Sequence, residues 1–393
     1  MAVELKGSPA NDYSFTSESS LDELALLAET AGARVVGRAV QKLASPHPAH
    51  YVGKGKLAEI KSQRGASGYT VVIFDDELSP SQQRNLENAL GVKVLDRTAL
   101  ILDIFAQRAR TREGALQVEL AQSEYLLPRL AGQWSHLERL EGAIGARGPG
   151  ETQLETDRRL VRNKIARLKR QIEAVRRQRA LYRRRRARAG VPVVALVGYT
   201  NAGKSTLMRA LSDAYVFTEV MPFATLDPLT RRIALPGGRA ALLSDTVGFI
   251  QKLPTQLVAA FRATLEELEA ADVLMHVVDI THPDAPLQSR TVEETLAELG
   301  LSEKPVITVL NKVDLLVRRD GSPVSGLEEL REQTGTLTHR PDALLISAEK
   351  GWGLETLLQR IEAVLRENAG ALARPKPRRL PSEAPARGSS GRR

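Results

Sequence analysis

The chain has 393 residues, of which 42% are hydrophobic, so it is long enough for two or three domains that each bury a core. It contains no cysteine, which excludes disulfide bonds, thiolate metal sites and cysteine nucleophiles. The 56 Lys and Arg residues exceed the 47 Asp and Glu residues and give a net charge of +9, which favours a polyanionic partner wherever the charge is clustered.

The N-terminal residues and the hydropathy of the chain bear on its location. Residues 1–20 are polar, contain no apolar core of the signal-peptide type and are expected to be flexible. No run of the chain approaches the roughly 18 apolar residues that a membrane span needs. We therefore expect a soluble cytoplasmic protein with at most weak association with a membrane surface.

Residues 21–104 are predicted to form a small α/β domain. Helical and strand-like patterns alternate along this part of the chain, beginning with a helix, over residues 21–32, 34–41, 56–65, 69–77, 79–91 and 92–98. Such alternation is typical of a mainly parallel sheet that is covered by helices.

Three polar clusters in this domain have alternative interpretations. The GKGK stretch at residues 53–56 is interpreted as a turn before a helix, with a phosphate or RNA contact as the alternative. His47 and His50 are interpreted as loop residues rather than metal ligands, because no third ligand lies near them in the sequence. The acidic residues 75–77 are interpreted as a solvated strand end, and a metal site is the alternative.

Residues 105–190 are predicted to form a helical hairpin whose two long helices are joined by a glycine-rich loop at 141–151. The second helix has about fifteen Arg and Lys residues between Arg158 and Arg188 but a single glutamate. Apolar residues still recur at helical spacing, so one stripe of this helix can pack on its partner. We interpret the basic helix as a surface that contacts nucleic-acid phosphates, with a solvated linker helix as the alternative. The loop, which includes Arg147, is either a flexible tip that enters an RNA cavity or an ordinary mobile loop.

Residues 191–367 are predicted to form a second α/β domain with a doubly wound, mostly parallel sheet, and residues 368–393 a disordered basic tail. An apolar strand at the start of this domain runs into Gly198-x-x-x-x-Gly203-Lys204-Ser205, which a helix follows. This order is typical of a P-loop, whose backbone amides bind phosphate oxygens at a helix N-terminus. The predicted phosphate-binding residues are Gly198, Tyr199, Thr200, Asn201, Ala202, Gly203, Lys204, Ser205 and Thr206.

Two of these residues have more specific predicted roles. Lys204 is expected to reach the β- and γ-phosphates, and the Ser205 hydroxyl is expected to bind Mg²⁺. The P-loop alone indicates only that a nucleoside triphosphate binds.

The base is indicated further along the chain, where an apolar strand ends in Asn311-Lys312-x-Asp314. The Asp314 carboxylate can accept two hydrogen bonds from the guanine edge, and adenine offers no such pair of donors, so the site discriminates between the bases. A second strand end at Ser347 and Ala348 can supply a backbone amide to the guanine carbonyl oxygen. The predicted base-binding residues are Asn311, Lys312, Val313, Asp314, Ser347, Ala348 and Glu349.

The stretch Asp245-Thr246-Val247-Gly248 has the spacing of a switch segment that senses the γ-phosphate. Asp245 is expected to hold a water molecule on Mg²⁺, and the Gly248 amide to contact the γ-phosphate. Phe249 follows, at the position where many such enzymes have a glutamine that orients the attacking water. A threonine upstream should bind Mg²⁺ while the γ-phosphate is present, and spacing does not choose between Thr218, Thr225 and Thr230.

Several stretches together resemble the HflX family of ribosome-associated GTPases, over about residues 30–367. These stretches are HPAHYVGKGKLAEI, RGPGETQLETDRR, FATLDPLTR and SDTVGFI, and the second has no counterpart in GTPases in general. The resemblance implies an α/β N-terminal domain, a helical hairpin and a GTPase domain, and many members carry a further C-terminal domain. It also implies that Thr225 is the magnesium ligand, within the nucleotide-binding stretch Phe223, Ala224, Thr225, Leu226 and Asp227.

The resemblance further implies the partners and the activity. Members bind the large (50S) ribosomal subunit and are thought to split 70S ribosomes, notably under stress. Lys204, Thr225 and Gly248 would then carry catalysis with Mg²⁺ and GTP, and the ribosome would supply the help that is missing at Phe249. The hairpin would contact 23S rRNA, and neither DNA binding nor oligomerisation is expected. The RNA-contact candidates are Arg147, Arg158, Arg159, Arg162, Arg167 and Arg170.

Two alternative functions fit the same motifs. One is a GTPase that acts in maturation of the large subunit or its RNA. The other is an RNA-binding regulatory protein in which GTP only stabilises the fold, so that RNA binding would not depend on the nucleotide.

Overall fold

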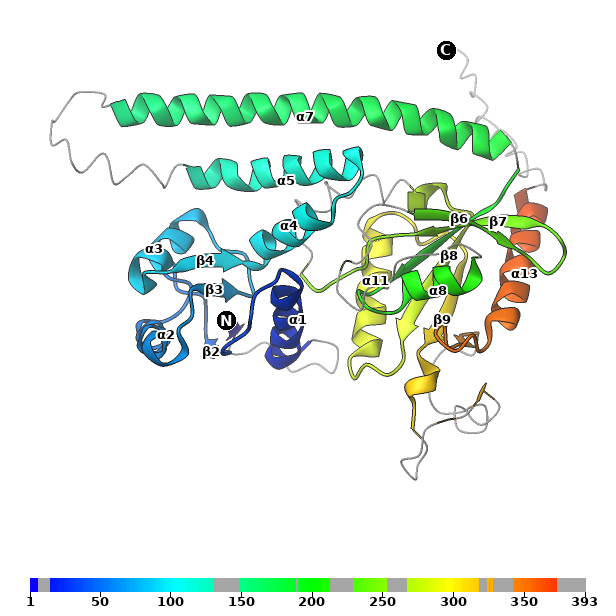
Figure 1. Cartoon of the computed structure of the whole chain (residues 1–393), viewed down its shortest axis with the longest axis horizontal. Coiled ribbons are helices and arrows are strands. Elements are labelled where there is room, and N and C mark those ends of the chain that lie inside the picture. The colour runs from blue at the N-terminus through cyan, green and yellow to red at the C-terminus, as the bar shows by residue number, and fades with distance from the viewer. Residues whose placement is uncertain are drawn as a thin grey trace, which may run out of the picture.

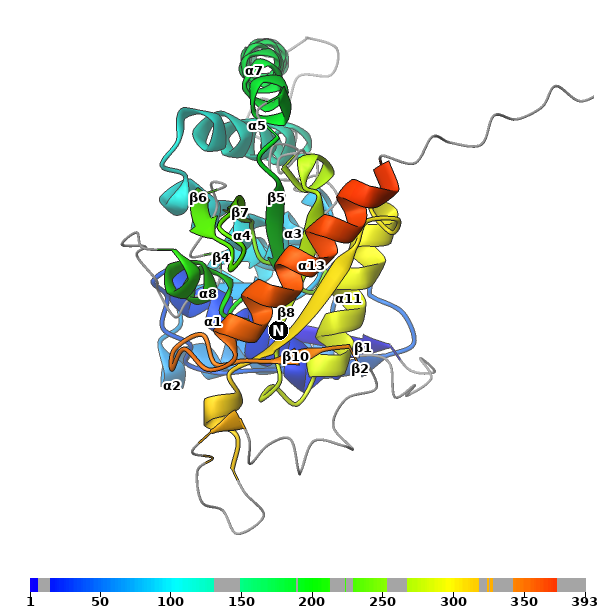
Figure 2. The ribbon, with the colours of Figure 1, turned by 90° about the vertical axis from the view of Figure 1, so that its right-hand side faces the viewer.

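The computed structural model describes residues 1–5, 15–130, 149–188, 190–212, 223, 229–252, 267–317, 324, 326–327 and 342–372. They form an N-terminal α/β domain, a pair of long helices and a second α/β domain (Figure 1). The helical pair lies along one side of both α/β domains in two perpendicular views (Figures 1 and 2).

The N-terminal domain alternates strands and helices as expected. Its elements are β1 (Ala2–Leu5), α1 (Ser17–Thr30), β2 (Val40–Leu43), α2 (Lys54–Ser67), β3 (Val71–Phe74), α3 (Pro80–Leu90), β4 (Lys93–Asp96) and α4 (Arg97–Arg108). β1 pairs with β2, and β3 pairs with β4, each pair being parallel. The Met1 ammonium donates a hydrogen bond to the Ile73 carbonyl (2.8 Å), and the Asp75 amide donates to the Met1 carbonyl (2.9 Å), so β1 also lies beside β3.

Two expectations for this domain were wrong in detail. Residues 1–5 are not flexible, because they form β1 between β2 and β3 and bury the side chains of Met1 and Ala2. The strand expected at 34–41 is displaced to Val40–Leu43, because the four residues of β1 set the residues that can pair with it.

The polar clusters of this domain have structural roles. The expectation that GKGK forms a turn before a helix was right only for Gly53, which caps α2, because Lys54, Gly55 and Lys56 already form the first turn of that helix. The Nδ1 atom of His47 accepts hydrogen bonds from the backbone amides of Ala49 (3.1 Å) and His50 (3.3 Å), which is the role of a loop residue. Asp75 differs from the expectation of a solvated strand end, since it is 1% exposed and pairs with Arg97 at 2.8 Å.

The hairpin helices are α5 (Arg112–Leu130) and α7 (Pro149–Arg188). Carboxylates of α5 pair with cations of α7, and the pairs are Glu119–Lys164 (2.8 Å), Glu124–Lys169 (2.8 Å) and Glu113–Arg179 (2.7 Å). Leu168, in the middle of α7, is 1% exposed and anchors the apolar stripe. The packing therefore combines a narrow apolar seam with neutralisation of one side of the basic helix.

The second α/β domain is built on a six-stranded sheet in the order β10-β9-β8-β5-β7-β6. Its elements are β5 (Val193–Gly198), α8 (Lys204–Leu211), β6 (Leu229–Ala234), β7 (Ala240–Asp245), β8 (Val273–Asp279), α11 (Ala285–Glu298), β9 (Val306–Asn311), the 3-10 turn η1 (Val313–Leu315), β10 (Leu344–Leu345) and α13 (Leu354–Leu372). β6 runs antiparallel to β7, and the other neighbouring pairs are parallel.

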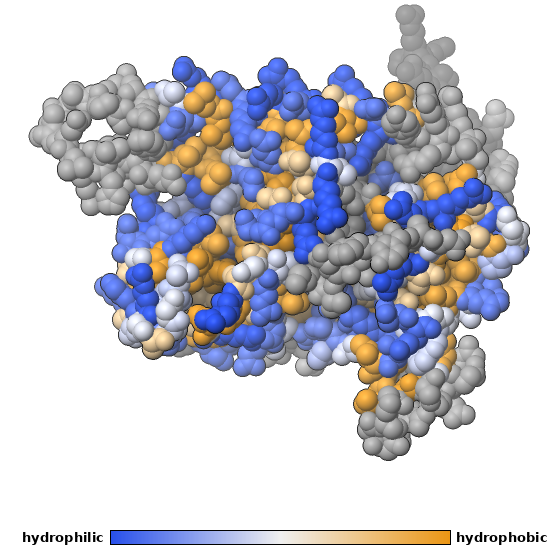
Figure 3. Space-filling model, in the orientation of Figure 1, coloured by the Kyte–Doolittle hydropathy of each residue, from blue (hydrophilic) through white to orange (hydrophobic). Residues whose placement is uncertain are grey.

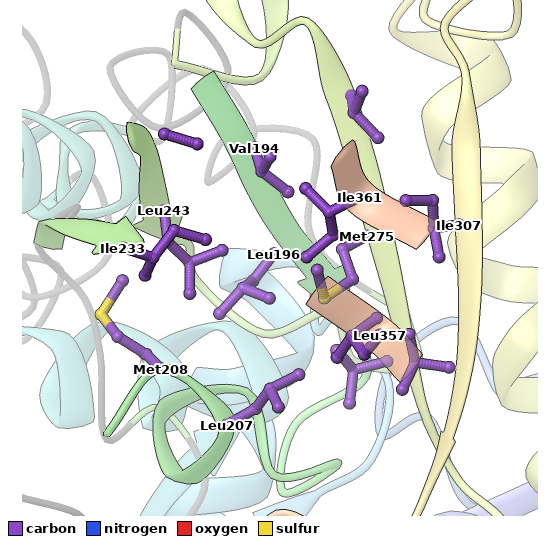
Figure 4. Close-up of a cluster of buried hydrophobic side chains, with 14 of the residues drawn as sticks. Val194, Leu196, Leu207, Met208, Ile233, Leu243, Met275, Ile307, Leu357 and Ile361 are labelled. Carbon is purple, nitrogen blue, oxygen red and sulfur yellow. The ribbon is translucent and has the colours of Figure 1, made fainter. Parts of the chain in front are cut away.

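Helices cover both faces of this sheet, which is the doubly wound arrangement expected from the sequence. Val194 and Leu196 of β5 pack with Leu207 of α8 and Leu357 of α13 on one face (Figure 4). Ala195 and Val197 point to the opposite face and join a second cluster that includes residues of α11. The carboxyl ends of the parallel strands therefore meet at one edge, where ligands bind in such sheets.

A membrane span was not expected, and within the described part of the chain no helix combines the length and the apolar character that crossing a bilayer requires.

Candidate functional site

The loop between β5 and α8 lies at the carboxyl edge of the sheet. Its backbone conformation requires glycine at two positions. Gly198 has φ 151°, and a Cβ there would lie 2.2 Å from the Val277 carbonyl oxygen. Gly203 has φ 93°, and a Cβ there would lie 2.2 Å from Asn311 Nδ2. Only glycine avoids both overlaps, so the backbone can close around an anion at the N-terminus of α8.

Lys204 is the first residue of α8, and its side chain lies inside this loop. Nζ donates hydrogen bonds to the carbonyl oxygens of Gly198 (3.0 Å) and Tyr199 (2.7 Å), and the residue is 7% exposed. Burial lowers the pKa of the Lys204 ammonium to about 8, although the nearby Asp245 carboxylate opposes this shift. A polyphosphate bound in the loop would supply the negative charge that this buried ammonium otherwise lacks.

Two of the residues expected to hold a cation lie side by side. Ser205 is in the first turn of α8, and Asp245 is the last residue of β7. Ser205 Oγ donates a hydrogen bond to Asp245 Oδ2 (2.7 Å), and Asp245 is fully buried. A hydroxyl and a carboxylate oxygen beside a phosphate-binding loop are the kind of ligands that Mg²⁺ prefers. This donor set therefore fits Mg²⁺.

The segment after Asp245 is connected to the P-loop by backbone hydrogen bonds. Phe249 N donates to the Gly198 carbonyl (3.1 Å), and Thr200 N donates to the Phe249 carbonyl (2.8 Å). These bonds bring Gly248 against the loop, where an added Cβ would lie 2.9 Å from Thr200 Cα and 3.0 Å from Lys204 Nζ. The Gly248 backbone is therefore next to the ammonium that would hold the β- and γ-phosphates.

Phe249 does not point toward the phosphates. Its side chain is 7% exposed and belongs to the apolar cluster that also contains Val197 and Tyr199. Thr246 likewise points away from the loop, since its hydroxyl donates to the Leu196 carbonyl (2.6 Å). Neither Phe249 nor Thr246 thus presents a polar side-chain group to the phosphates.

Asn311 connects the P-loop to the two loops expected to bind the base. Its Nδ2 donates to the Ala202 carbonyl (2.9 Å), and its Oδ1 accepts a hydrogen bond from the Ala348 amide (3.0 Å). Asp314 is the second residue of η1, which begins directly after the αL residue Lys312 (φ 67°). Asn311, Lys312, Asp314 and Ala348 are therefore brought together at the carboxyl edge of the sheet, as predicted from the motifs.

Asp279 is a site residue that the sequence reasoning missed. It ends β8, opposite Asn311 in the register of β8 and β9, and its Oδ2 accepts a hydrogen bond from Lys312 Nζ (2.6 Å). Its Oδ1 accepts from the amide (3.0 Å) and the hydroxyl (2.6 Å) of Thr281. An acidic residue at the end of a strand that neighbours the Asn311 strand was the signal that could have indicated it.

Replacing Asn311 by alanine is expected to lower the free energy of unfolding of the nucleotide-free protein by about 2–4 kcal/mol. The change removes two hydrogen bonds of a residue that is 2% exposed and leaves the Ala202 carbonyl and the Ala348 amide to find other partners. Urea unfolding followed by circular dichroism measures this loss. Asn163→Ala, at an exposed position of α7, is the control and should change the unfolding midpoint little; equal midpoints for both variants would contradict the prediction.

The remaining predicted residues are placed as follows. Phe223 is 2% exposed and packs edge-on against Phe105 of the N-terminal domain, with ring centroids 4.6 Å apart. Thr230 lies on β6, and its hydroxyl is 3.5 Å from the Ser244 hydroxyl. Glu349 is exposed and pairs with Arg209 (3.0 Å). The predicted residues outside the described part of the chain are Arg147, Thr218, Ala224, Thr225, Leu226 and Asp227.

The arginines of α7 divide into two groups. Arg159, Arg162, Arg167 and Arg170 are exposed, whereas Arg158 is half-buried. The exposed ones recur every three to five residues and lie about 100° or more around the helix from Leu168, the buried residue of the seam with α5. Hydrophilic residues follow this outer edge in the space-filling view, with hydrophobic ones between them (Figure 3).

Comparisons with known proteins agree with this geometry. Residues 18–106 match the family GTP-binding GTPase N-terminal, residues 108–186 the GTP-binding GTPase Middle Region, and residues 193–312 the 50S ribosome-binding GTPase. The chain is 50% identical to a GTPase HflX of Caldanaerobacter subterraneus subsp. tengcongensis over 348 residues, which are 88% of this chain and 77% of the relative. It is 46% identical to a GTPase HflX of Escherichia coli (strain K12) over 339 residues, which are 86% of this chain and 77% of the relative.

A solved structure also resembles the chain. It is a GTP-binding protein from the hyperthermophilic archaeon Sulfolobus solfataricus in complex with GDP, with a TM-score of 0.45 and 26% identity over 93% of this chain and 99% of that chain.

Proposed function

This chain belongs to the HflX family of P-loop GTPases, which hydrolyse GTP, and from that premise we propose that it binds the large ribosomal subunit and splits 70S ribosomes under stress. The observation that supports the ribosome as its target is the exposed row of arginines on α7, in a chain that matches the 50S ribosome-binding GTPase family. Because one side of α7 is already neutralised by α5, the charge on the outer side is available to RNA phosphates.

The site residues support GTP as the substrate. The P-loop amides and Lys204 would bind the phosphates, and the Asp314 carboxylate would accept hydrogen bonds from the guanine edge. Lys312 would lie along the base, held in place by its ion pair with Asp279 (2.6 Å). A nucleotide with another base would leave the Asp314 carboxylate without its donors, which lowers its affinity.

Mg²⁺ is the cofactor that the donor set fits. Ser205 would bind it directly, Asp245 through a water molecule, and Thr225 while the γ-phosphate is present. When bound, it would neutralise charge that develops on the phosphates during hydrolysis.

The buried position of Phe249 supports a rate of GTP hydrolysis that depends on the ribosome. The Gly248 amide can donate to the γ-phosphate, but the buried Phe249 side chain has no group that could orient the attacking water. We therefore expect slow hydrolysis by the free protein and faster hydrolysis once the ribosome orders the switch segments or supplies a polar group.

The cycle follows from the difference between the GTP and GDP states. The γ-phosphate would hold Thr225 and Gly248 and favour the form whose hairpin inserts at the ribosome, with its arginines and the 141–151 loop against 23S rRNA. Hydrolysis after splitting would release these contacts and the factor. Differential contacts of this kind are what any nucleotide switch requires.

The test is GTP turnover by the protein alone, with 50S subunits and with 70S ribosomes, while light scattering follows subunit dissociation. GTP-dependent loss of 70S scattering together with stimulated turnover is the expected result. Stimulation by incomplete subunits alone would favour a role in large-subunit maturation. RNA binding that is indifferent to the nucleotide would favour the regulatory RNA-binding protein.

The double variant Arg162→Gln/Arg170→Gln is expected to weaken binding to 50S subunits by about tenfold to a hundredfold at physiological salt. Each lost phosphate contact should also lower the dependence of log K on log salt by about one unit. Cosedimentation over a series of salt concentrations measures both quantities. Arg239→Gln/Arg360→Gln, which removes two exposed arginines of the GTPase domain, is the control of equal charge. Equal losses in the two double variants would show that only net charge matters.

A further inference from the structure

The described residues of the two switch segments, which are Phe223 and residues 245–252, pack against the N-terminal domain. Val247 and Ile250, which flank Gly248 and Phe249, join an apolar cluster with residues of α1, α4 and α5. Phe223, from the other switch segment, packs on Phe105 of α4. Both segments that would respond to the γ-phosphate therefore contact the same domain.

A polar cluster that is largely buried, apart from Lys252, reinforces this apolar contact. We define the interdomain cluster as the side chains of Ser20, Glu23, Asp75, Arg97, Tyr199 and Lys252. Its centre is Arg97, which is 2% exposed and donates to Asp75 Oδ1 (2.8 Å) and, across the domain boundary, to the Gln251 carbonyl oxygen (2.9 Å). Lys252 approaches from the GTPase domain and donates to Asp75 Oδ2 (2.6 Å).

The cluster holds the Gln251 backbone from both sides. The Gln251 amide donates to the hydroxyl oxygen of the P-loop residue Tyr199 (2.7 Å), while its carbonyl accepts from Arg97. The Tyr199 hydroxyl in turn donates to Glu23 of α1 (2.9 Å). The chain three residues after Gly248 is thus fixed between the P-loop and the N-terminal domain.

This arrangement is better explained by positioning than by stability. Ion pairs that are buried gain little over apolar residues of the same volume, because both charges lose their hydration. What they impose is geometry, since a buried guanidinium must keep its partners in place. The geometry imposed here is the path of the backbone from Gly248 to Lys252, which lies against Lys204 at one end.

The neighbouring residue Asp96 connects the same junction to the hairpin. Asp96 is fully buried at the boundary of β4 and α4, and its carboxylate accepts hydrogen bonds from the Tyr125 hydroxyl (2.9 Å) and Arg129 Nη2 (3.1 Å) of α5. Two consecutive residues, Asp96 and Arg97, therefore hold the hairpin on one side and the switch segment on the other.

We infer that Arg97 is a positioning residue for GTP hydrolysis, and that the Asp96–Arg97 junction transmits the position of the hairpin to the backbone after Gly248. Arg97 acts from the N-terminal domain through Gln251, without touching the nucleotide. The first part concerns the hydrolysis of GTP itself, and the second part rests on the proposed function, because it requires that the ribosome contacts the hairpin.

The first part is tested with Tyr199→Phe and Arg97→Lys in the full-length protein. Tyr199→Phe removes only the hydroxyl that holds the Gln251 amide, and Arg97→Lys keeps the charge but loses the forked geometry. Both are expected to slow single-turnover GTP hydrolysis by about tenfold, which corresponds to about 1.4 kcal/mol, and to change the Kd for GDP less than twofold. Arg38→Gln, which breaks the ion pair of the N-terminal domain between Arg38 and Asp22, is the control.

The role of Arg97 in positioning is decided by whether the hydrolysis rate changes without a matching change in the Kd for GDP. A purely structural role would lower the thermal midpoint and weaken GDP binding in parallel with the rate, and an absent role would leave the rate of Tyr199→Phe at the wild-type value. Either result overturns the positioning of the switch segment by Arg97 and Tyr199.

The second part is tested with Tyr125→Phe, which removes one donor to Asp96 and leaves Arg129 in place. The expected result is unchanged turnover by the free variant, unchanged cosedimentation with 50S subunits and a severalfold smaller stimulation by them. If wild-type protein neither binds nor responds to 50S subunits, the proposed function fails. If wild-type protein responds and Tyr125→Phe responds equally, the transmission through Asp96 fails while the proposed function stands.

Discussion

Replacing Lys204 by alanine is expected to lower the single-turnover rate of GTP hydrolysis by about a thousandfold. The Lys204 ammonium is held inside the P-loop by the carbonyl oxygens of Gly198 and Tyr199, next to Gly248. It would meet the β- and γ-phosphates in a water-poor environment, where a preorganised positive charge stabilises a transition state most strongly. Rapid-quench measurement of phosphate release at saturating GTP gives this rate.

The same variant is not expected to destabilise the nucleotide-free protein. Burial lowers the pKa of the Lys204 ammonium to about 8, so below that pH the folded nucleotide-free protein carries the full cost of a desolvated charge. Lys204→Ala should therefore not lower the unfolding midpoint of the nucleotide-free protein. Lys61→Ala, at an exposed position of α2, is the control and should hydrolyse GTP at the wild-type rate. A loss of rate that only follows a loss of folded protein would contradict the catalytic role.

Replacing Asp314 by asparagine is expected to weaken GDP binding by about a hundredfold or more. The carboxylate can accept two hydrogen bonds from the guanine ring N–H and amino group, whereas an asparagine amide offers one acceptor and one donor. A guanine donor is then left facing another donor, and an unpaired polar group of this kind discriminates strongly between ligands. Xanthine carries a carbonyl in place of the amino group, so the variant should bind xanthosine diphosphate better than the wild type does.

Competition against a fluorescent GDP analogue measures both affinities. Asp342→Asn removes an exposed carboxylate from the same domain and is expected to keep the wild-type preference for guanine. A variant Asp314→Asn that loses affinity for both diphosphates equally would show that Asp314 supports the loop rather than reads the base.

The parts of the site that the sequence predicted are those that short stretches of backbone define. The P-loop spacing requires Gly198 and Gly203, and at both positions an added Cβ would overlap a neighbouring atom in the structure. Asn311 ends β9 and Lys312 follows it, so the parallel sheet places both at the same edge as the P-loop. The roles of Thr225 and Arg147 stay predictions, since both residues lie outside the described part of the chain.

The interdomain contacts could not be predicted in the same way. Arg97 and the Gln251 carbonyl are separated by 154 positions, and Lys252 is 177 positions from Asp75. Nothing in the local pattern distinguishes such pairs from solvated charges, which is why Asp75 was interpreted as a solvated strand end. β1 escaped prediction for a related reason, because the four residues of β1 gain their order from β2 and β3 rather than from their own sequence.

The length of α7 has a mechanical consequence. The helix has 40 residues and ends at Arg188, shortly before β5, whose last residue opens the P-loop. At 1.5 Å per residue it is a rod about 60 Å long, and a turn of about 5° at its base moves the far end by about 5 Å. Displacements of ångström size beside the phosphates are thereby enlarged at the end of the hairpin that lies farthest from the nucleotide. The basic helix is in this sense a lever arm as well as a binding surface.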